Sequence, residues 1–136
     1  MERRMSRAAK TILVFGIYCL AVGAVLTLVP NLLLAGLGLE PTREPYIRAL
    51  GVVLLTLGFY YIAAARAEAV VFFRWTLWGR PFVLAAFIGL ALAGAAPPII
   101  ILFGVVDAAA ALWTALALRG SKDSNQESKT RRSGIE

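Results

Sequence analysis

Residues 99–118, IIILFGVVDAAAALWTALAL, decide the fold, because they form a twenty-residue apolar run that contains a single charged side chain, Asp107. Such a run is as long as an α-helix needs to cross the hydrocarbon core of a bilayer. A carboxylate near the bilayer centre costs about 3 kcal/mol or more, so it should face the protein interior and either have a partner or stay protonated. The stretch therefore predicts a membrane-spanning helix with an inward-facing Asp107.

Three further apolar blocks, residues 11–29, 46–65 and 76–96, have similar lengths and lie before this one. Since 60% of the 136 residues are hydrophobic and the charges lie almost entirely outside the blocks, the sequence predicts an all-α membrane protein with four spans. The membrane domain covers residues 11–119. Pro30, Pro45 and the Pro97-Pro98 pair mark the connections between spans.

Two connections are not ordinary loops. Residues 31–39, NLLLAGLGL, are too few to span and too apolar to be solvated, so they predict an interfacial segment after the first span. Residues 69–78, AVVFFRWTLW, combine aromatic rings with Arg74, which suits the headgroup level. These residues could form an interfacial helix or the tilted beginning of the third span, with a kink near Gly79 and Pro81.

Lysine and arginine residues set the expected orientation, since cytoplasmic flanks carry the excess of these residues. On one side of the membrane lie the basic N-terminus (residues 1–10), the arginines of the second connection and the basic residues after the fourth span. The flanks on the other side contain only Arg43 and Arg48. We therefore expect a bacterial inner (cytoplasmic) membrane protein with both termini cytoplasmic. Residues 120–136 are polar and predict a disordered tail.

Small residues recur along each block at steps of three and four, which places them on one helical face. Lipid provides no hydrophobic force between helices, so close backbone approach at small residues drives their association. The pattern predicts a left-handed four-helix bundle. The predicted packing glycines are Gly16, Gly23, Gly51, Gly58, Gly89 and Gly104.

Asp107 lies on the small-residue face of its span, and two arginines are candidates to pair with it. Arg48 continues the glycine face of the second span and is the favoured partner, while Arg80 is the second candidate. The pair could be structural and fix the register of the bundle, or Asp107 could be part of a proton-linked or cation-linked site. Both interpretations stay open.

Aromatic residues gather at the expected cytoplasmic half of the spans: Tyr60, Tyr61, Trp78 and Trp113, with Arg74 nearby. Such a collar could hold a lipid headgroup, a quinone or another small amphipathic ligand, with arginine supplying the anion contact. An ordinary interfacial belt of tryptophan and tyrosine has the same sequence pattern.

Residues that carry chemistry are scarce. The sequence has no histidine, one cysteine (Cys19), serines only near its ends, and no phosphate-binding loop. We therefore expect no catalytic residues, no metal site and no cofactor, although a membrane-embedded enzyme is kept as a remote alternative. The net charge of +6 lies at chain ends and one loop rather than on a basic face, so nucleic-acid binding is not expected.

Three stretches carry a resemblance to a known family: YIRALGVVLLTLGFYYIAAAR (residues 46–66), the APP turn (96–98) and FGVVDAAAALWTALALR (103–119). Over about residues 29–119 the chain resembles small bacterial four-span proteins of the DoxX-like kind. The resemblance implies a four-helix inner-membrane bundle, sometimes an accessory subunit of a membrane redox assembly. The leading expectation is a non-enzymatic accessory or scaffold subunit that contacts the lipid bilayer and either a membrane-protein partner or further copies of itself. The alternative is a binding or transport module for a lipid, quinone or other small amphipathic ligand.

Overall fold

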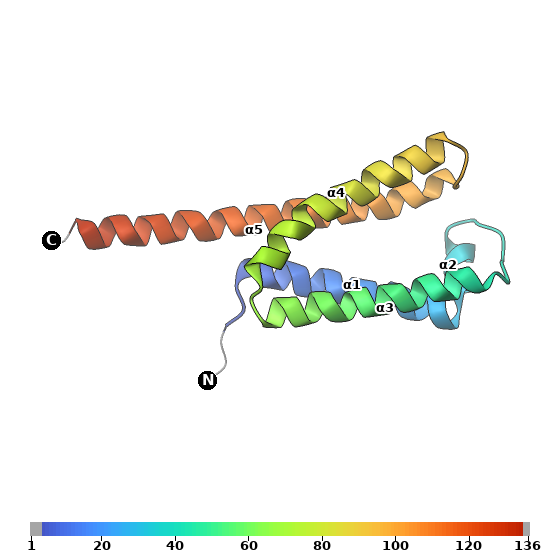
Figure 1. The fold of residues 1–136 in the computed structure, drawn as a ribbon, viewed down its shortest axis with the longest axis horizontal. Helices are drawn as coiled ribbons and strands as arrows, with labels where there is room; N and C mark the ends of the chain where they lie inside the picture. The colour runs from blue at the N-terminus through green and yellow to red at the C-terminus, as the bar shows by residue number, and fades with distance from the viewer. Residues whose placement is uncertain (1–3, 135–136) are drawn as a thin grey trace. The chain divides into compact units, whose positions relative to one another are not determined.

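A computed structural model describes residues 4–134, and its regular structure over that range is entirely helical. The elements are α1 (Arg7–Leu28), α2 (Pro30–Gly36), α3 (Pro45–Arg66), α4 (Val70–Leu92), the 3-10 turn η1 (Pro98–Ile100) and α5 (Ile101–Ser133) (Figure 1). Four helices are long and apolar enough to cross a membrane: α1, α3, α4 and the η1–α5 segment. The prediction of an all-α protein with four spans is therefore confirmed.

The chain divides into two compact units. The α1–α3 unit comprises Ile12–Ala69, and the α4–α5 unit comprises the residues up to Thr11 together with those from Val70 onward. The first turns of α1 therefore belong to the α4–α5 unit.

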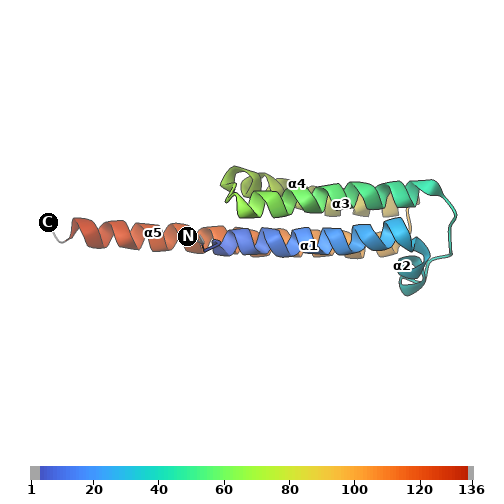
Figure 2. The ribbon, with the colours of Figure 1, turned by 90° about the horizontal axis from the view of Figure 1, so that it is seen from below.

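Glycines hold the α1–α3 unit together. Helices α1 and α3 run side by side in opposite directions (Figures 1 and 2). A Cβ added at Gly23 would lie 2.8 Å from the carbonyl oxygen of Gly51, and one added at Gly58 would lie 2.8 Å from that of Gly16. The two backbones thus approach so closely at two levels that only glycine fits, which is how helices associate when lipid surrounds them.

The segment after the first span, which the sequence predicts to be interfacial, forms the short helix α2. Pro30 begins it, at a position where the missing N–H is no loss. Gly38, with φ of 72°, ends it by turning the chain so that the Leu39 N–H donates to the Leu34 carbonyl at 2.8 Å. This is the usual glycine-dependent way for a helix to stop.

In the α4–α5 unit, the two helices pack around Gly104. A Cβ there would lie 2.8 Å from the Cα of Leu84, so α4 and α5 also approach closely. Gly89 was predicted on the same packing face, and this prediction is wrong, because a Cβ at Gly89 would meet no atom within 4 Å. Five residues beyond Leu84, Gly89 lies about 140° around the helix and therefore faces away from α5.

Helix α4 begins at Val70, earlier than the third span predicted from residue 76. Residues 70–78, which include the four aromatic side chains of this stretch, are thus the beginning of the third span and not a separate interfacial helix. The helix continues through Pro81, which has no N–H to donate to the Leu77 carbonyl. Figure 1 shows the early part of α4 (green) following a different direction from the rest (yellow).

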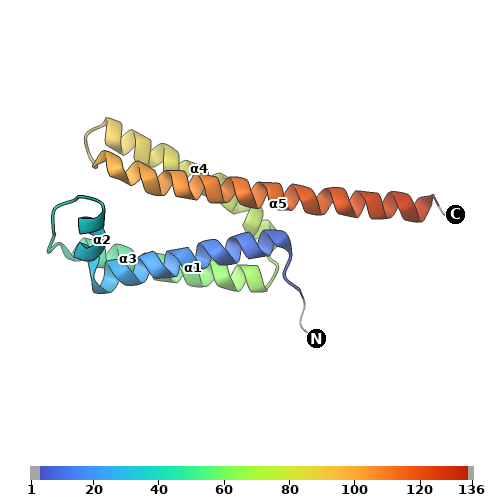
Figure 3. The same ribbon diagram turned by 180° about the vertical axis from the view of Figure 1, so that it is seen from behind.

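The C-terminal tail differs from the prediction of disorder, because α5 continues as a helix to Ser133. Figures 2 and 3 show this part (red) as a straight extension beyond the beginning of α4. Two physical reasons favour the helix: it grows from an already formed span and so needs no nucleation, and Glu127 precedes Arg131 by four residues. Residues 1–3 of the predicted basic N-terminus and 135–136 of the predicted tail lie outside the described residues.

Candidate functional site

Four buried polar side chains gather inside the α4–α5 unit. Thr11 is 2% exposed, Thr76 7%, Arg80 3% and Thr114 0%. Thr76 and Arg80 lie on α4, Thr114 on α5, and Thr11 on the first turns of α1. We call these four residues the polar cluster, and it brings three helical segments together.

Hydrogen bonds join the arginine and threonine side chains of the polar cluster. Nη2 of Arg80 donates to Oγ1 of Thr76 at 2.8 Å and to Oγ1 of Thr114 at 3.2 Å. The hydroxyl oxygens of Thr114 and Thr11 lie 2.7 Å apart and share a hydrogen bond. Thr114 on α5 therefore joins α4 to the first turns of α1. A hydrogen bond to a charged group such as the guanidinium contributes about 1.5–3 kcal/mol.

The hydroxyl groups are also anchored to their own helices. Thr76 donates to the carbonyl of Phe73 at 2.7 Å, and Thr11 donates to the carbonyl of Ala8 at 2.7 Å. Such bonds to the preceding turn hold each hydroxyl in one orientation. The oxygen lone pairs are therefore presented in a fixed geometry, that of Thr76 to the guanidinium of Arg80 and that of Thr11 to the hydroxyl of Thr114.

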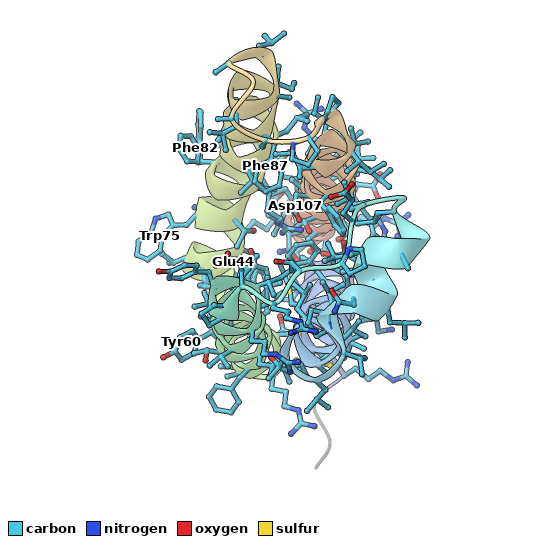
Figure 4. All side chains as sticks on the ribbon, turned by 90° about the vertical axis from the view of Figure 1, so that its right-hand side faces the viewer. Glu44, Tyr60, Trp75, Phe82, Phe87 and Asp107 are labelled. Atoms are coloured by element: carbon cyan, nitrogen blue, oxygen red, sulfur yellow. The ribbon has the colours of Figure 1, made fainter. Side chains whose placement is uncertain are left out.

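Asp107 is half-buried on α5 (Figure 4), seven residues or about 10 Å along the helix from Thr114. Among the described residues, the positive charge whose field acts on Asp107 is that of Arg80. The second of the two sequence candidates is thus the charge near Asp107. A guanidinium and a carboxylate consequently lie within electrostatic range in the same unit, among apolar side chains.

Arg48, the partner that the sequence favoured for Asp107, is engaged elsewhere. Its Nη1 donates to the carbonyl of Thr27 at 2.6 Å and to that of Leu28 at 3.3 Å. These carbonyls belong to the last turn of α1, where backbone acceptors have no partner within the helix. Arg48 therefore caps α1, and its positive charge also suits the negative end of that helix.

The two tyrosines of the predicted collar have different surroundings. Tyr61 is 6% exposed and packs against Phe15, with ring centroids 5.0 Å apart and the rings tilted by 51°. Tyr60 is 57% exposed and contacts the ring of its neighbour Phe59. Tyr61 is thus part of the α1–α3 packing and is not available to a ligand, which corrects the prediction that both tyrosines line one collar.

The other collar residues, Arg74, Trp78 and Trp113, belong to the α4–α5 unit and are exposed. Trp78 is 83% exposed and Trp113 49%. Trp75 and Phe82, at 69% and 70%, project outward from the same helix as Trp78 (Figure 4). Outward aromatic rings on a spanning helix are typical of an interfacial belt.

The chemistry of the site is that of a positive charge held among hydroxyls. Within residues 4–134, no group of three or more His, Cys, Asp or Glu side chains could hold a metal ion. The guanidinium can orient hydroxyl groups, tie helices and act on the nearby carboxylate.

Sequence reasoning identified Arg80 and Asp107 but missed Thr11 and Thr76. A usable signal was present, since Thr76 and Arg80 are four residues apart and so share a helical face. The contribution of Thr11 comes from a helix distant in the sequence and had no local signal.

Comparison of the chain with models of protein families, with curated proteins and with solved structures finds no match.

Proposed function

We propose that this chain is a non-enzymatic accessory or scaffold subunit of a membrane assembly, located in the cytoplasmic membrane of a bacterium with both termini on the cytoplasmic side. The observation that carries the proposal is the polar cluster. Its guanidinium and hydroxyl groups donate to and accept from one another across three helical segments, so the polar side chains inside the membrane helices join helices.

Two further features support this role. Lysine and arginine residues lie mainly at the chain ends and the second connection, as expected for cytoplasmic flanks. Helix α5 extends as an exposed helix to Ser133, which offers other proteins a surface outside the bilayer. The DoxX-like resemblance of the sequence is in keeping with an accessory subunit.

Native mass spectrometry of the full chain, extracted gently from its own membrane, tests the proposal. The expected result is a complex that contains a second protein or further copies of the chain. A lone monomer with no protein partner, obtained under conditions that preserve known membrane complexes, would overturn it.

A second candidate function is the binding of a small amphipathic ligand, favoured by the half-buried Asp107 in the field of Arg80. The same measurement decides this case. A bound small molecule that disappears in the Asp107→Asn variant and persists in the Asp123→Asn variant, which changes an exposed carboxylate on the same helix, would support it. Equal retention in both variants would contradict it.

A further inference from the structure

Four large apolar side chains of α4 lie on one side of the helix and are 59–83% exposed. They recur at steps of four, three and four residues, which keeps them on one face, and Figure 4 shows Trp75 and Phe82 projecting outward. The side of α4 that packs within the unit carries the buried Phe73, Thr76 and Arg80 instead. We call the following residues of the outward side the aromatic face: Val71, Arg74, Trp75, Trp78, Gly79 and Phe82.

The aromatic face carries hydrogen-bond donors at its beginning. Arg74 precedes Trp78 by four residues, so the guanidinium lies at the edge of this face. Arg74, Trp75 and Trp78 each present N–H groups and no acceptor in their polar heads. Among residues 4–134, none shares a hydrogen bond or an ion pair with these three side chains. Exposed donors thus lie within about 6 Å along the helix axis.

The order of side chains along the aromatic face matches the order of groups in a phospholipid. Arg74 precedes Phe82 by eight residues, or about 12 Å along the helix. The headgroup layer on each side of a bilayer is about 6 Å thick. With Arg74 at the level of the phosphates, Trp78 lies at the boundary of the hydrocarbon and Phe82 lies inside it.

Gly79 leaves a position without a side chain among the aromatic rings. It follows Trp75 by four residues and precedes Phe82 by three, so it lies between them on the same side of the helix. A Cβ added at Gly79 would meet no atom within 4 Å, unlike one added at Gly104, which packs on α4. An acyl chain can therefore approach the backbone at Gly79, with a ring above it and a ring below it.

We propose that the aromatic face binds an anionic phospholipid. The phosphate accepts hydrogen bonds from the guanidinium of Arg74, whose planar fork suits two phosphate oxygens at once. The ester oxygens accept from the indole N–H groups of Trp75 and Trp78, and one acyl chain passes Gly79 to reach Phe82. This site goes beyond the accessory role and does not depend on Asp107.

Charge complementarity selects an anionic lipid. Helix α4 contains no aspartate or glutamate, so no carboxylate of its own helix neutralises Arg74. A zwitterionic headgroup carries a cation that offsets its phosphate, whereas phosphatidylglycerol keeps a net negative charge that a basic side chain near the membrane surface attracts.

A second protein helix fits this face less well than a lipid does. Helices surrounded by lipid associate where small residues let their backbones approach. The aromatic face has one small residue, Gly79, and large rings stand three and four residues away from it. Flexible acyl chains can follow such a surface, but a rigid helix would be held away from Gly79 by the rings.

Native mass spectrometry of the full chain, released from nanodiscs with equal amounts of dioleoyl phosphatidylglycerol and dioleoyl phosphatidylcholine, tests the proposal. The chain should retain about fivefold more phosphatidylglycerol than phosphatidylcholine. Arg74→Gln should remove this preference. An equal loss in the control Arg119→Gln would overturn the proposal, because it would show a general attraction of basic residues for anionic lipid.

Arg119 is a matched control because it is an exposed cation of the same unit that lacks the aromatic surroundings. The residues three and four positions before it are Leu116 and Ala115, and the helix after it is polar. Arg119→Gln should therefore keep the preference within about twofold of the unmodified chain.

A second pair of variants tests the path of the acyl chain. Gly79→Leu fills the position between the rings, and Gly89→Leu adds the same side chain elsewhere on α4. A Cβ at either glycine would meet no atom within 4 Å, so both variants keep the packing of the unit. Gly79→Leu should lower the retained phospholipid several-fold, because contact with the chain is lost, while Gly89→Leu should not. Equal retention in the two variants would overturn the proposed path.

Further measurements distinguish other occupants. An excess of inorganic phosphate should not displace the lipid, because free phosphate makes none of the apolar contacts; displacement would overturn the assignment to a lipid. Benzoylphenylalanine in place of Phe82, irradiated in native membranes, should crosslink to phospholipid, and a crosslink to a protein instead would overturn the proposal. Asp107→Asn should leave the retained phosphatidylglycerol unchanged, and its loss would show that the lipid lies at Asp107 and not on the aromatic face.

Discussion

Gly51 is the position at which the packing of α1 against α3 is most open to test. A Cβ added there would contact Oγ1 of Thr27 and would lie 2.6 Å from the backbone nitrogen of Thr27 and 2.8 Å from the carbonyl oxygen of Gly23. Non-bonded heavy atoms in ordinary contact lie about 3.5 Å apart, so α3 would have to move by about 0.7–0.9 Å to relieve the two backbone contacts. Backbone atoms cannot rotate away as a side chain can.

The magnitude of the Gly51→Ala effect follows from two opposing terms. Overpacking costs about 1–3 kcal/mol, and the upper end applies here because two of the obstructing atoms belong to the backbone. Alanine in a helix gains about 1 kcal/mol over glycine. The net destabilisation is about 2 kcal/mol, which raises the equilibrium constant for opening of the α1–α3 unit roughly 30-fold.

The chain contains its own reporter for this opening. Cys19 is the single cysteine, lies on α1 and is 2% exposed, so a maleimide reaches it only when the unit opens. With reclosing faster than labelling, the labelling rate follows the open population. Gly51→Ala should therefore raise that rate roughly 30-fold relative to the unmodified chain in mild detergent.

Gly36→Ala is the matched control, because Gly36 belongs to the same unit and a Cβ there would meet no atom within 4 Å. Its labelling rate should stay within about twofold of the unmodified chain. If Gly51→Ala labels no faster than Gly36→Ala, the close approach of α1 and α3 is refuted.

Three further predictions concern the polar side chains. Thr114→Val should lower the unfolding free energy of the α4–α5 unit by about 1–3 kcal/mol, because a buried hydrogen-bond acceptor is lost. The control Thr130→Val changes an exposed threonine and should alter this free energy by less than about 0.5 kcal/mol. Thermal unfolding followed by tryptophan fluorescence measures both variants. Arg48→Gln should raise cysteine labelling by about threefold, because the last carbonyls of α1 lose their cap, and an unchanged rate would contradict that role. Asp107→Asn should destabilise the α4–α5 unit by less than Arg80→Ala does, because Arg80 keeps its threonine partners when only Asp107 is changed. The reverse order would show that the Asp107 carboxylate, and not the threonines, is the main partner of Arg80.

The number and type of the spanning helices could be predicted because they depend on local composition. Twenty apolar residues form a spanning helix whatever surrounds them. The glycines at positions 16, 23, 51 and 58 were also identifiable, because close packing of helices in lipid requires small residues at heptad spacing. Gly89 has the same local pattern but faces away from its neighbour, which depends on how α4 is rotated about its own axis.

The partners of the charged residues could not be predicted in the same way. Counting residues along the helices gives the depth of a side chain but not its direction, and the candidate site depends on direction. Arg48 lies near the end of α1 and reaches its carbonyls, and Arg80 donates to one hydroxyl on its own helix, Thr76, and to one on α5, Thr114. A long arginine side chain takes whichever acceptors its rotamer reaches, and the carbonyls that Arg48 reaches and the Thr114 hydroxyl that Arg80 reaches belong to helices distant in the sequence.

Different contacts hold the helices together in the two units. Helices α1 and α3 rely on backbone contact at four glycines, while α4 and α5 combine contact at Gly104 with a guanidinium shared among hydroxyls. Both sets of contacts use the inward faces of the helices. The exposed side chains of α5 take part in neither set of contacts. In the apolar part of this helix they include Leu102, Val105 and Leu112, which lipid solvates as well as another helix would, so apolar character alone does not select a protein partner for this surface.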